Sequence, residues 1–479
     1  MALSKVGSNQ IDSAASLTVS GNVSADGGTI KLDGNYPTGT SNVAIGDAAL
    51  DDGSLSGGYN TAAGAGALSA NTSGAQNTAV GATSSDANTT GSYNSGFGQS
   101  SLGSNTTGSS NTGLGRGALS ANTTASNNTA AGYNALAANT TGTPHVAIGA
   151  NALAANTTGN GSVAVGYNSL DAATTGDNNT AVGNYALTSL TTAGSITALG
   201  YNAGNNLTTA ASVVAIGAYA GDAITTGGYH TAVGAGALTA ATTGTSNTAI
   251  GNDSLPAVTT GVNNTGLGQS AGYGATGNYG VFVGARSGTS QTSGDQNTYI
   301  GEAAGYSVTT GSRNTIIGRH SGNGGGLDIR TSSNNIVLSD GDGNPRLYLN
   351  ANGTLFVPQV YNDTTGSGAN MFVNSSGVIH RSTSSRRYKN TIADATHGLT
   401  ELLALRPVTY KGNGDAVFGG LIAEEVHDAG LTEFVQYNDD NEPDALAYGN
   451  MVSLCIKAIQ ELKTELDAAK ARIAALEAG

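Results

Sequence analysis

Apolar residues return along most of the chain in a short motif that repeats at a fixed interval. The motif reads Asn-Thr-Ala-Val-Gly, then Ala-Leu, then Asn-Thr-Thr-Gly. The glycine that closes its first part, hereafter the marker glycine, recurs every 17 residues at Gly64, Gly81, Gly98, Gly115, Gly132, Gly149, Gly166, Gly183, Gly200, Gly217, Gly234, Gly251 and Gly268. Gly46 precedes this series by 18 residues, and Gly284, Gly301 and Gly318 follow at steps of 16, 17 and 17. Such a period indicates a protein built from stacked repeats.

Each repeat contains one short segment with the alternation of a β-strand. In the segment 77–81, Thr78 and Val80 fall on one side and Ala79 on the other. The Asn-Thr-Thr-Gly that follows, as at residues 88–91, supplies a turn, because glycine accepts the positive φ that other residues resist. A unit this short cannot bury its own apolar side, so the sequence predicts a mainly β fold, a parallel β-solenoid of 17-residue coils. With a rise of roughly 4.8 Å per coil, 17 coils would form a rod of about 80 Å.

Two further columns of the repeat predict how the coils pack. The Asn before each strand is expected to stack into a ladder of side-chain amides. A leucine lies four residues after most marker glycines, and because an exposed column would form a large apolar stripe, it belongs either to the interior or to a seam between protomers. This column comprises Leu50, Leu68, Leu102, Leu119, Leu136, Leu153, Leu170, Leu187, Leu238 and Leu255. Glycine replaces it at Gly204, Gly221, Gly272, Gly288, Gly305 and Gly322, which predicts a change in cross-section.

Composition and charge narrow the class of protein. Glycine accounts for 73 residues, aromatic residues for 5% and charged residues for 10%, which favours an extended repetitive β structure over a globule or a charge-rich disordered chain. The net charge of −14 argues against nucleic acid as a partner, since phosphate binding needs clustered Lys and Arg. Between residues 41 and 326 the only Lys or Arg residues are Arg116, Arg286, Arg313 and Arg319.

Targeting and covalent features are sparse. The first residues lack an apolar signal-peptide core, and no run of about 18 apolar residues suggests a membrane span, so we expect a protein made and assembled in a cytoplasm. Cys455 is the only cysteine, which excludes an intrachain disulfide. No cofactor is predicted.

The repeat resembles a known family of adhesins. Ser41–Leu50 and its copies are similar to the head repeats of trimeric autotransporter adhesins of the YadA type. The resemblance implies a left-handed parallel β-roll that associates as a trimer. Repeats of that family are shorter, so the extra residues here are expected to enlarge the turn around Thr-Thr-Gly.

The repeats occupy residues 41–326, and the segments on either side of them follow other patterns. Residues 1–40 contain short alternating strands and resemble the particle-proximal start of phage fibre proteins. Residues 327–383 break the period and are predicted to form a β-hairpin stem, because an Asp-Gly-Asp-Gly turn lies between two apolar runs. Asp340, Asp342 and Asn344 also alternate as in a calcium loop, but the downstream Glu is missing, which favours a plain turn and no metal.

Residues 384–479 have the composition of a separate domain, because half of the 18 Lys and Arg lie there. Apolar residues spaced by three and four form a heptad seam that predicts a terminal coiled coil over 452–476. An amphipathic helix packed on its own domain is the alternative. The seam comprises Val452, Cys455, Ile459, Leu462, Leu466, Ala469, Ile473 and Leu476.

Three motifs carry a resemblance at the start of this domain. The segments 383–390, 402–410 and 419–426 follow one another as in the intramolecular chaperone of endosialidases, also called peptidase S74. Ser384, Arg387 and Lys389 match the family's opening motif, in which Ser385 replaces an Asp. In the third motif, Glu424 stands where Gln or His is common.

The resemblance implies an α+β chaperone domain that cleaves its own chain once. The bond would be Thr383–Ser384, with Ser384 as the nucleophile and Lys389 as the base. A serine hydroxyl needs such a base, and a lysine serves when burial lowers its pKa. His397 and His427 lie near the motifs, but no spacing makes either a base, so surface or core roles are favoured.

Together these resemblances predict a tail fibre or tail spike of a phage. The expected partners are two further copies of the chain, a phage tail or baseplate protein at the N-terminus, and a host cell-surface glycan or protein. The location would be the virion, after synthesis in the host cytoplasm. A bacterial trimeric surface adhesin and a polysaccharide-degrading tail spike are the alternatives. The repeats show no pair of carboxylates set among aromatic residues, as sugar hydrolysis would need, which favours binding over catalysis on an external substrate.

Overall fold

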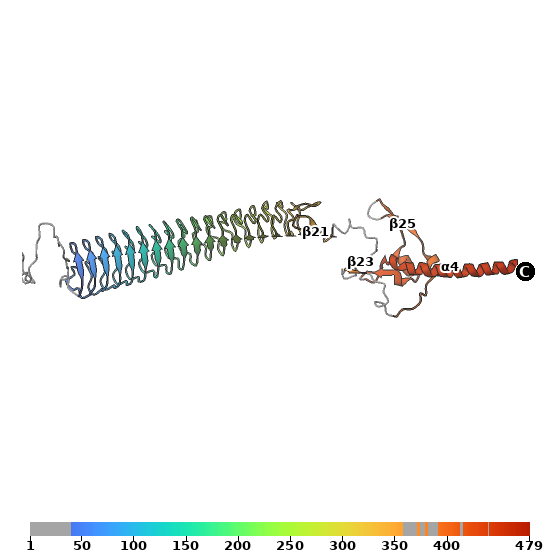
Figure 1. Cartoon of the computed structure of the whole chain (residues 1–479), viewed down its shortest axis with the longest axis horizontal. Helices are drawn as coiled ribbons and strands as arrows, with labels where there is room; N and C mark the ends of the chain where they lie inside the picture. Colours follow the sequence, from blue (N-terminus) through green and yellow to red (C-terminus); the bar gives the residue numbers. More distant parts are fainter. Residues whose placement is uncertain (1–39, 358–370, 374–378, 382–390, 412–414, 439) are drawn as a thin grey trace, which may run out of the picture. The chain divides into compact units, whose positions relative to one another are not determined.

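A computed structural model describes residues 40–357, 371–373, 379–381, 391–411, 415–438 and 440–479 (Figure 1). The chain divides into two compact units, Met1–Asp363 and Thr364–Gly479, which we describe separately. The first is a row of stacked coils, and the second combines short helices and hairpins with a long C-terminal helix, α4 (Tyr448–Glu477).

The stacked coils form the predicted parallel β-solenoid, with one three-residue strand in each coil. Every strand pairs in parallel with the next, so that Thr78 lies opposite Ser95 and Ala79 opposite Gly96. The strands are β1 (Val43–Ile45), β2 (Thr61–Ala63), β3 (Thr78–Val80), β4 (Ser95–Phe97), β5 (Thr112–Leu114), β6 (Thr129–Ala131), β7 (Val146–Ile148), β8 (Val163–Val165), β9 (Thr180–Val182), β10 (Thr197–Leu199), β11 (Val214–Ile216), β12 (Thr231–Val233), β13 (Thr248–Ile250), β14 (Thr265–Leu267), β15 (Val281–Val283), β16 (Thr298–Ile300) and β17 (Thr315–Ile317).

The interior of each coil is filled from two columns. The middle residue of each strand points inward, and Ala79 and Ala147 are fully buried. The leucine column is also interior, since Leu136 is fully buried, which decides between the two positions considered for it. Leu136 adopts a φ of +54°, a conformation that glycine accepts more readily, so burial of the side chain offsets a backbone cost.

The marker glycines are required by the closeness of the coils. Gly149 has a φ of +131°. A Cβ added there would lie 2.4 Å from the carbonyl oxygen of Gly166 in the next coil. Because that neighbour is backbone and cannot move aside, only glycine fits the column.

Buried asparagines link the coils in two ladders. In the predicted ladder, the backbone N–H of Asn94 donates to Asn77 Oδ1 at 2.9 Å, and Asn94 Nδ2 donates to the Gly108 carbonyl at 2.8 Å. The second ladder starts each Asn-Thr-Thr-Gly, where Asn105 Nδ2 donates to Asn88 Oδ1 at 2.8 Å. The sequence suggested only turn chemistry for this second column. It is an interior element that spans Asn71, Asn88, Asn105, Asn122, Asn139 and Asn156.

The interior changes where glycine replaces the leucine column. Phe282 and Tyr299 occupy the middle of β15 and β16 and are buried. A Cβ on Gly288 would lie 2.4 Å from the ring of Phe282, and one on Gly305 would lie 2.5 Å from the ring of Tyr299. The aromatic rings therefore refill the space that the leucines leave.

The last coil of the solenoid is longer than the others and ends in antiparallel strands. It contains the small hairpin of β18 (Asn323–Gly324) and β19 (Leu327–Asp328). β20 (Ile336–Ser339) pairs in parallel with β17 and antiparallel with β21 (Pro345–Leu349), which pairs with β22 (Leu355–Phe356).

The turn between β20 and β21 is built on one carboxylate. Asp340 Oδ1 accepts the backbone N–H groups of Asp342 and Asn344 at 3.0 and 2.9 Å. The other oxygen pairs with Arg346 at 2.6 Å. These hydrogen bonds, those to Asn344 most of all, lower the pKa of Asp340 to about 2. The Asp340 carboxylate, which opens the calcium-loop pattern, is thus already hydrogen-bonded within the turn.

The second unit has its own small core. Its elements are β23 (Met371–Val373), β24 (Ile379–Arg381), α2 (Leu399–Ala404), β25 (Val408–Lys411), β26 (Val417–Gly420), α3 (Ala423–Asp428), a 3-10 turn (Thr432–Phe434), β27 (Val435–Tyr437), β28 (Pro443–Leu446) and α4. Val426, Leu431 and Phe434 pack against Met451 and Leu454 of α4. Among the described residues, no helix has the length and apolar character needed to cross a membrane.

Candidate functional site

The predicted cleavage site lies outside the described residues. Thr383, Ser384 and Lys389 belong to the segment 382–390, so their dyad stays a prediction. The structure does bring the second and third motifs together, because β25 and β26 pair with Val408 opposite Gly420. Beside this hairpin Arg406 forms an ion pair with Glu425.

The two histidines near the motifs are held by neighbours within the same unit. His397 Nδ1 pairs with Glu433 Oε1 at 2.7 Å, which raises the pKa of His397. His427 Nδ1 lies 2.8 Å from the hydroxyl of Tyr437. Both contacts fit the structural roles that the sequence favoured.

The outer side of the solenoid sheet exposes apolar residues in almost every coil. We define the outer sheet face as the first and third residues of β1 to β17 together with Ile336 and Leu338. Leu114 and Ile148 are 54% and 43% exposed. Within these strands the face carries Val, Ile, Leu, Ala, Phe, Thr and Ser but no charge. The third residues of these strands form a continuous row of Val, Ile, Leu, Ala and Phe, whereas the first residues are mostly Thr.

The helix α4 exposes a second apolar stripe. Met451, Leu454 and Ala458 are the residues that α4 buries against its own unit. The predicted heptad seam lies elsewhere on the helix and is exposed, with Ile459 65% and Leu462 54% accessible. The helix therefore packs on its unit as in the alternative interpretation, yet leaves the seam free.

One corner of the coil carries different side chains in different coils. We define the corner column as the two residues that follow each marker glycine. Four tyrosines from successive coils form a ladder there, with ring centroids 5.4, 6.1 and 5.4 Å apart and near-perpendicular planes. They are Tyr167, Tyr185, Tyr201 and Tyr219. In later coils, the same corner carries the charged residues Arg286, Glu302 and Arg319.

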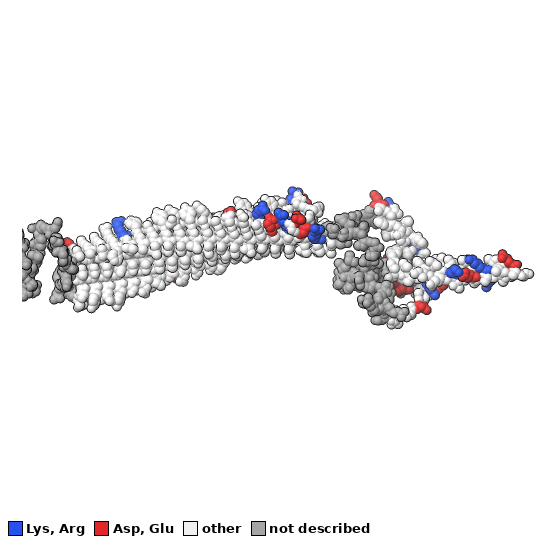
Figure 2. Space-filling model, in the orientation of Figure 1, with Lys and Arg blue, Asp and Glu red and all other residues white. Residues whose placement is uncertain are grey.

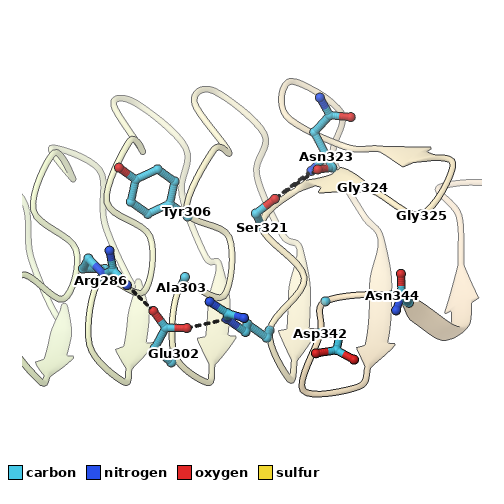
Figure 3. A pocket seen from close by; sticks show the side chains of 12 residues that line it. Arg286, Glu302, Ala303, Tyr306, Ser321, Asn323, Gly324, Gly325, Asp342 and Asn344 are labelled. Carbon is cyan, nitrogen blue, oxygen red and sulfur yellow. Dashed lines mark hydrogen bonds and ion pairs between the residues drawn. The ribbon is translucent and has the colours of Figure 1, made fainter.

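These charged residues line a hollow of about 400 Å³ near the C-terminal end of the solenoid (Figure 3). We define the end pocket by Arg286, Glu302, Tyr306, Arg319, Asp342 and Asn344. Glu302 bridges two coils, with Oε1 2.5 Å from Arg286 Nη2 and Oε2 2.5 Å from Arg319 Nε. These bonds, to Arg286 first, lower the pKa of Glu302. Figure 2 shows charged side chains gathered in this region and sparse over the rest of the visible solenoid.

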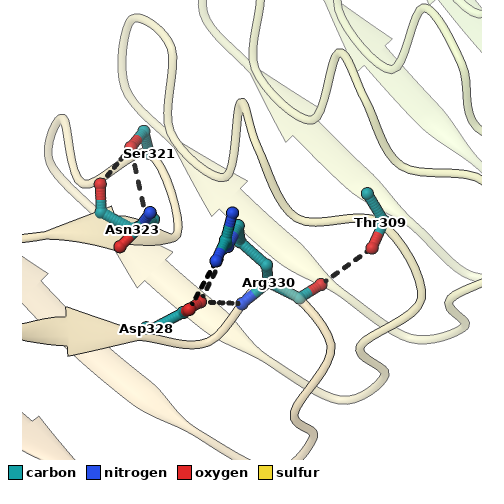
Figure 4. A network of polar contacts seen from close by, with 5 residues as sticks. All are labelled: Thr309, Ser321, Asn323, Asp328 and Arg330. Atoms are coloured by element: carbon teal, nitrogen blue, oxygen red, sulfur yellow. Dashed lines mark hydrogen bonds and ion pairs between the residues drawn. The ribbon is translucent and has the colours of Figure 1, made fainter.

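A polar network fixes the long last coil beside the pocket (Figure 4). Arg330 Nη2 pairs with Asp328 Oδ2 at 2.7 Å, and this contact lowers the pKa of Asp328 to about 2. Thr309 Oγ1 donates to the Arg330 carbonyl at 3.2 Å. Ser321 Oγ donates to the Asn323 carbonyl at 3.1 Å. Ser321 and the β18 residues Asn323 and Gly324 line the end pocket, and the Thr309–Arg330 bond ties their long coil to the preceding one.

No family model, curated protein or solved structure matches the chain. The functional interpretation therefore depends on the geometry of the described residues and on the two resemblances that the sequence motifs carry.

Proposed function

We propose that the protein is the shaft of a homotrimeric phage tail fibre or spike that attaches the particle to a host surface. The observation that carries this proposal is the outer sheet face, an uncharged apolar strip that extends over every coil from β1 to β20. Burial of apolar surface contributes roughly 25 cal/mol per Å², so covering such a strip with identical strips favours self-association strongly. The number three comes from the resemblance to YadA-type heads.

A second set of exposed apolar groups supports the same assembly. The heptad seam of α4 is unpaired in one chain, and it suits a coiled coil between copies. In the same unit, the β25–β26 hairpin exposes Tyr410, Val417 and Phe418, of which Val417 is 64% accessible. Self-association of the second unit would cover these groups as well.

The assembly is tested by placing charge on the outer sheet face. We expect the double variant Leu114→Lys/Ile148→Lys to lose the trimer, because three copies would bury six lysines, whereas the single chain leaves both positions exposed. Thr107→Lys/Thr141→Lys is the matched control, since these exposed threonines lie on turns of the same two coils. Light scattering after size exclusion gives the mass, and circular dichroism checks the fold. A lysine variant that keeps the mass of wild type would exclude this face as the seam.

The proposal includes a C-terminal chaperone, residues 384–479, that drives trimerisation and is released by cleavage before Ser384. Its support is the motif resemblance. Mass spectrometry of the purified full chain, beside Ser384→Ala and Lys389→Ala, tests the cut. We expect wild type to lose the last 96 residues and both variants to remain intact. An intact wild-type trimer would remove self-cleavage from the proposal and leave the fibre in place.

The end pocket favours attachment over hydrolysis of a host glycan. Hydrolysis needs a carboxylic acid that gives up its proton near neutral pH, and therefore a raised pKa. Glu302 has the opposite environment, because two guanidinium groups hold its pKa low. The pocket is thus arranged to bind, and the only bond cleavage proposed is the single cut within the chain itself.

A further inference from the structure

We propose that the end pocket binds an uncharged sugar residue of a surface polysaccharide. This inference rests on the proposed attachment role and names the site and the ligand class for it. The pocket lies entirely within the solenoid unit, and three successive coils supply its charged corner through Arg286, Glu302 and Arg319.

The charges of the pocket exclude the simplest ionic ligands. Two guanidinium groups and two carboxylates line it, so their formal charges cancel. An anion drawn to Arg286 or Arg319 would meet Glu302, and a cation drawn to Glu302 would meet both arginines. The arrangement instead suits a ligand without net charge that forms many hydrogen bonds.

The pocket offers donors and acceptors side by side. Glu302 occupies one N–H-bearing nitrogen of each arginine and holds the two planes in place. None of the other guanidinium nitrogens of Arg286 and Arg319 has a protein partner in the part of the chain that the structure describes. Asp342 and Asn344 supply acceptors across the hollow (Figure 3). Hydroxyl groups both donate and accept, so a sugar with adjacent hydroxyls can use both kinds of partner.

An aromatic ring adds an apolar surface to these polar groups. Tyr306 is 39% exposed on the wall of the pocket. Sugar-binding sites combine a small number of placed polar groups with an apolar ring that covers the C–H side of the ligand. The solenoid holds these groups on a rigid scaffold, which lowers the entropy cost of binding.

The ion pairs contribute little to the stability of the fold, so residues of the pocket can be substituted without unfolding the solenoid. The side chains of Arg286, Glu302 and Arg319 are 56%, 39% and 50% exposed, and ion pairs exposed to this extent add little to stability. Substitutions there should leave the solenoid intact. A loss of binding would then report on the pocket rather than on the fold.

The test is a microarray of uncharged and acidic bacterial polysaccharides, probed with the full-length protein. We expect retention on one or more uncharged glycans, and a signal at least about tenfold weaker for Arg319→Ala and for Tyr306→Ala, equivalent to about 1.4 kcal/mol. Arg116→Ala is the matched control, because Arg116 is an exposed arginine of the same corner column in a distant coil. It should bind as wild type does.

Each outcome decides the proposal. Retention on acidic glycans only, no retention on any glycan, or equal binding by the pocket variants would each overturn it. Light scattering and thermal melting of the same samples separate the failures: a trimer with normal stability and no glycan binding removes this inference alone, whereas a monomeric wild type removes the proposed assembly.

Discussion

The early coils, residues 61–159, and the late coils, residues 265–337, have the same strand register but different interiors. In the early coils, each buried asparagine of the second ladder donates to the one in the preceding coil, as Asn105 does to Asn88. In the late coils, Phe282 and Tyr299 fill the space and glycine replaces the inward leucine. The late coils keep the first asparagine ladder, but the column of Asn88 and Asn105 becomes Ala275, Gln291 and Val308 there, so the two regions should respond differently when their interiors are disturbed.

The largest effect is expected in the late coils from Phe282→Ala. Removing a buried ring leaves a cavity against Gly272 and Gly288, which costs about 3–5 kcal/mol. Tyr273→Ala is the control, because Tyr273 is 49% exposed in the same coil and should change stability by about 0.5 kcal/mol or less. Amide hydrogen exchange of β14 to β16 measures the local loss. Equal protection in the two variants would contradict the aromatic interior.

A smaller loss is expected in the early coils from Asn105→Ala. The change leaves Asn88 Oδ1 without its donor and removes one of the two acceptors of Asn122 Nδ2, which costs about 1–3 kcal/mol. Asn105→Leu copies the buried Leu190 of a later coil, and it breaks the same two bonds but fills the space. We expect Asn105→Leu to melt between wild type and Asn105→Ala. An alanine variant as stable as wild type would show that the ladder adds nothing.

The sequence was sufficient to predict the solenoid, because the 17-residue period itself specifies a stack of similar coils. The strand positions, the parallel stacking and the Asn77–Asn94 ladder follow from residues that return every 17 positions. Alternation could not tell which side of the strand faces inward, since Thr78 and Val80 looked as suitable for burial as Ala79. The narrow interior decides this, because only the small residue fits beside the leucine.

Other features escaped prediction for particular reasons. Asn88 and Asn105 were interpreted as turn residues, although the apolar Leu190 and Leu207 at the same position of later coils signal burial. The end pocket was missed because residues 17 apart in sequence meet only after stacking. Its signal was present in the sequence, since Arg286 and Arg319 both lie in the corner column.

In the coils between the two regions, we can ask how much contacts between surface tyrosines add to stability. Tyr201 contacts Tyr185 and Tyr219 edge to face, and such pairs are worth about 0.5–1.5 kcal/mol. Tyr201→Ala should therefore lower the melting temperature slightly, whereas Tyr93→Ala, which removes a tyrosine that is 62% exposed and outside the ladder, should have less effect. Identical melting of both variants would contradict a stabilising ladder.

The smallest effect concerns the two histidines that replace a ladder asparagine. His145 Nε2 donates to Gly159 O at 2.6 Å while Nδ1 accepts from the Ser162 N–H, and His230 has the equivalent pair of contacts. This geometry needs neutral rings, and burial lowers the pKa of both. Because the unfolded chain then binds more protons below about pH 6.5, stability should fall as the pH decreases from that value.

The control for this pH dependence is already present in the chain. His145→Asn/His230→Asn restores the residue that Asn128 and Asn247 have in neighbouring coils. The double variant should lose less stability than wild type between pH 7.5 and pH 5.5, as followed by thermal melting. Equal losses in the two proteins would assign the pH effect to other groups.

The central claim is that the outer sheet face joins copies of the chain. Sedimentation equilibrium of the purified full-length protein tests it most directly. We expect a mass three times the 47.0 kDa of one chain, or three times that of the chain shortened before Ser384. A folded protein that sediments as a single chain at micromolar concentration would contradict the claim.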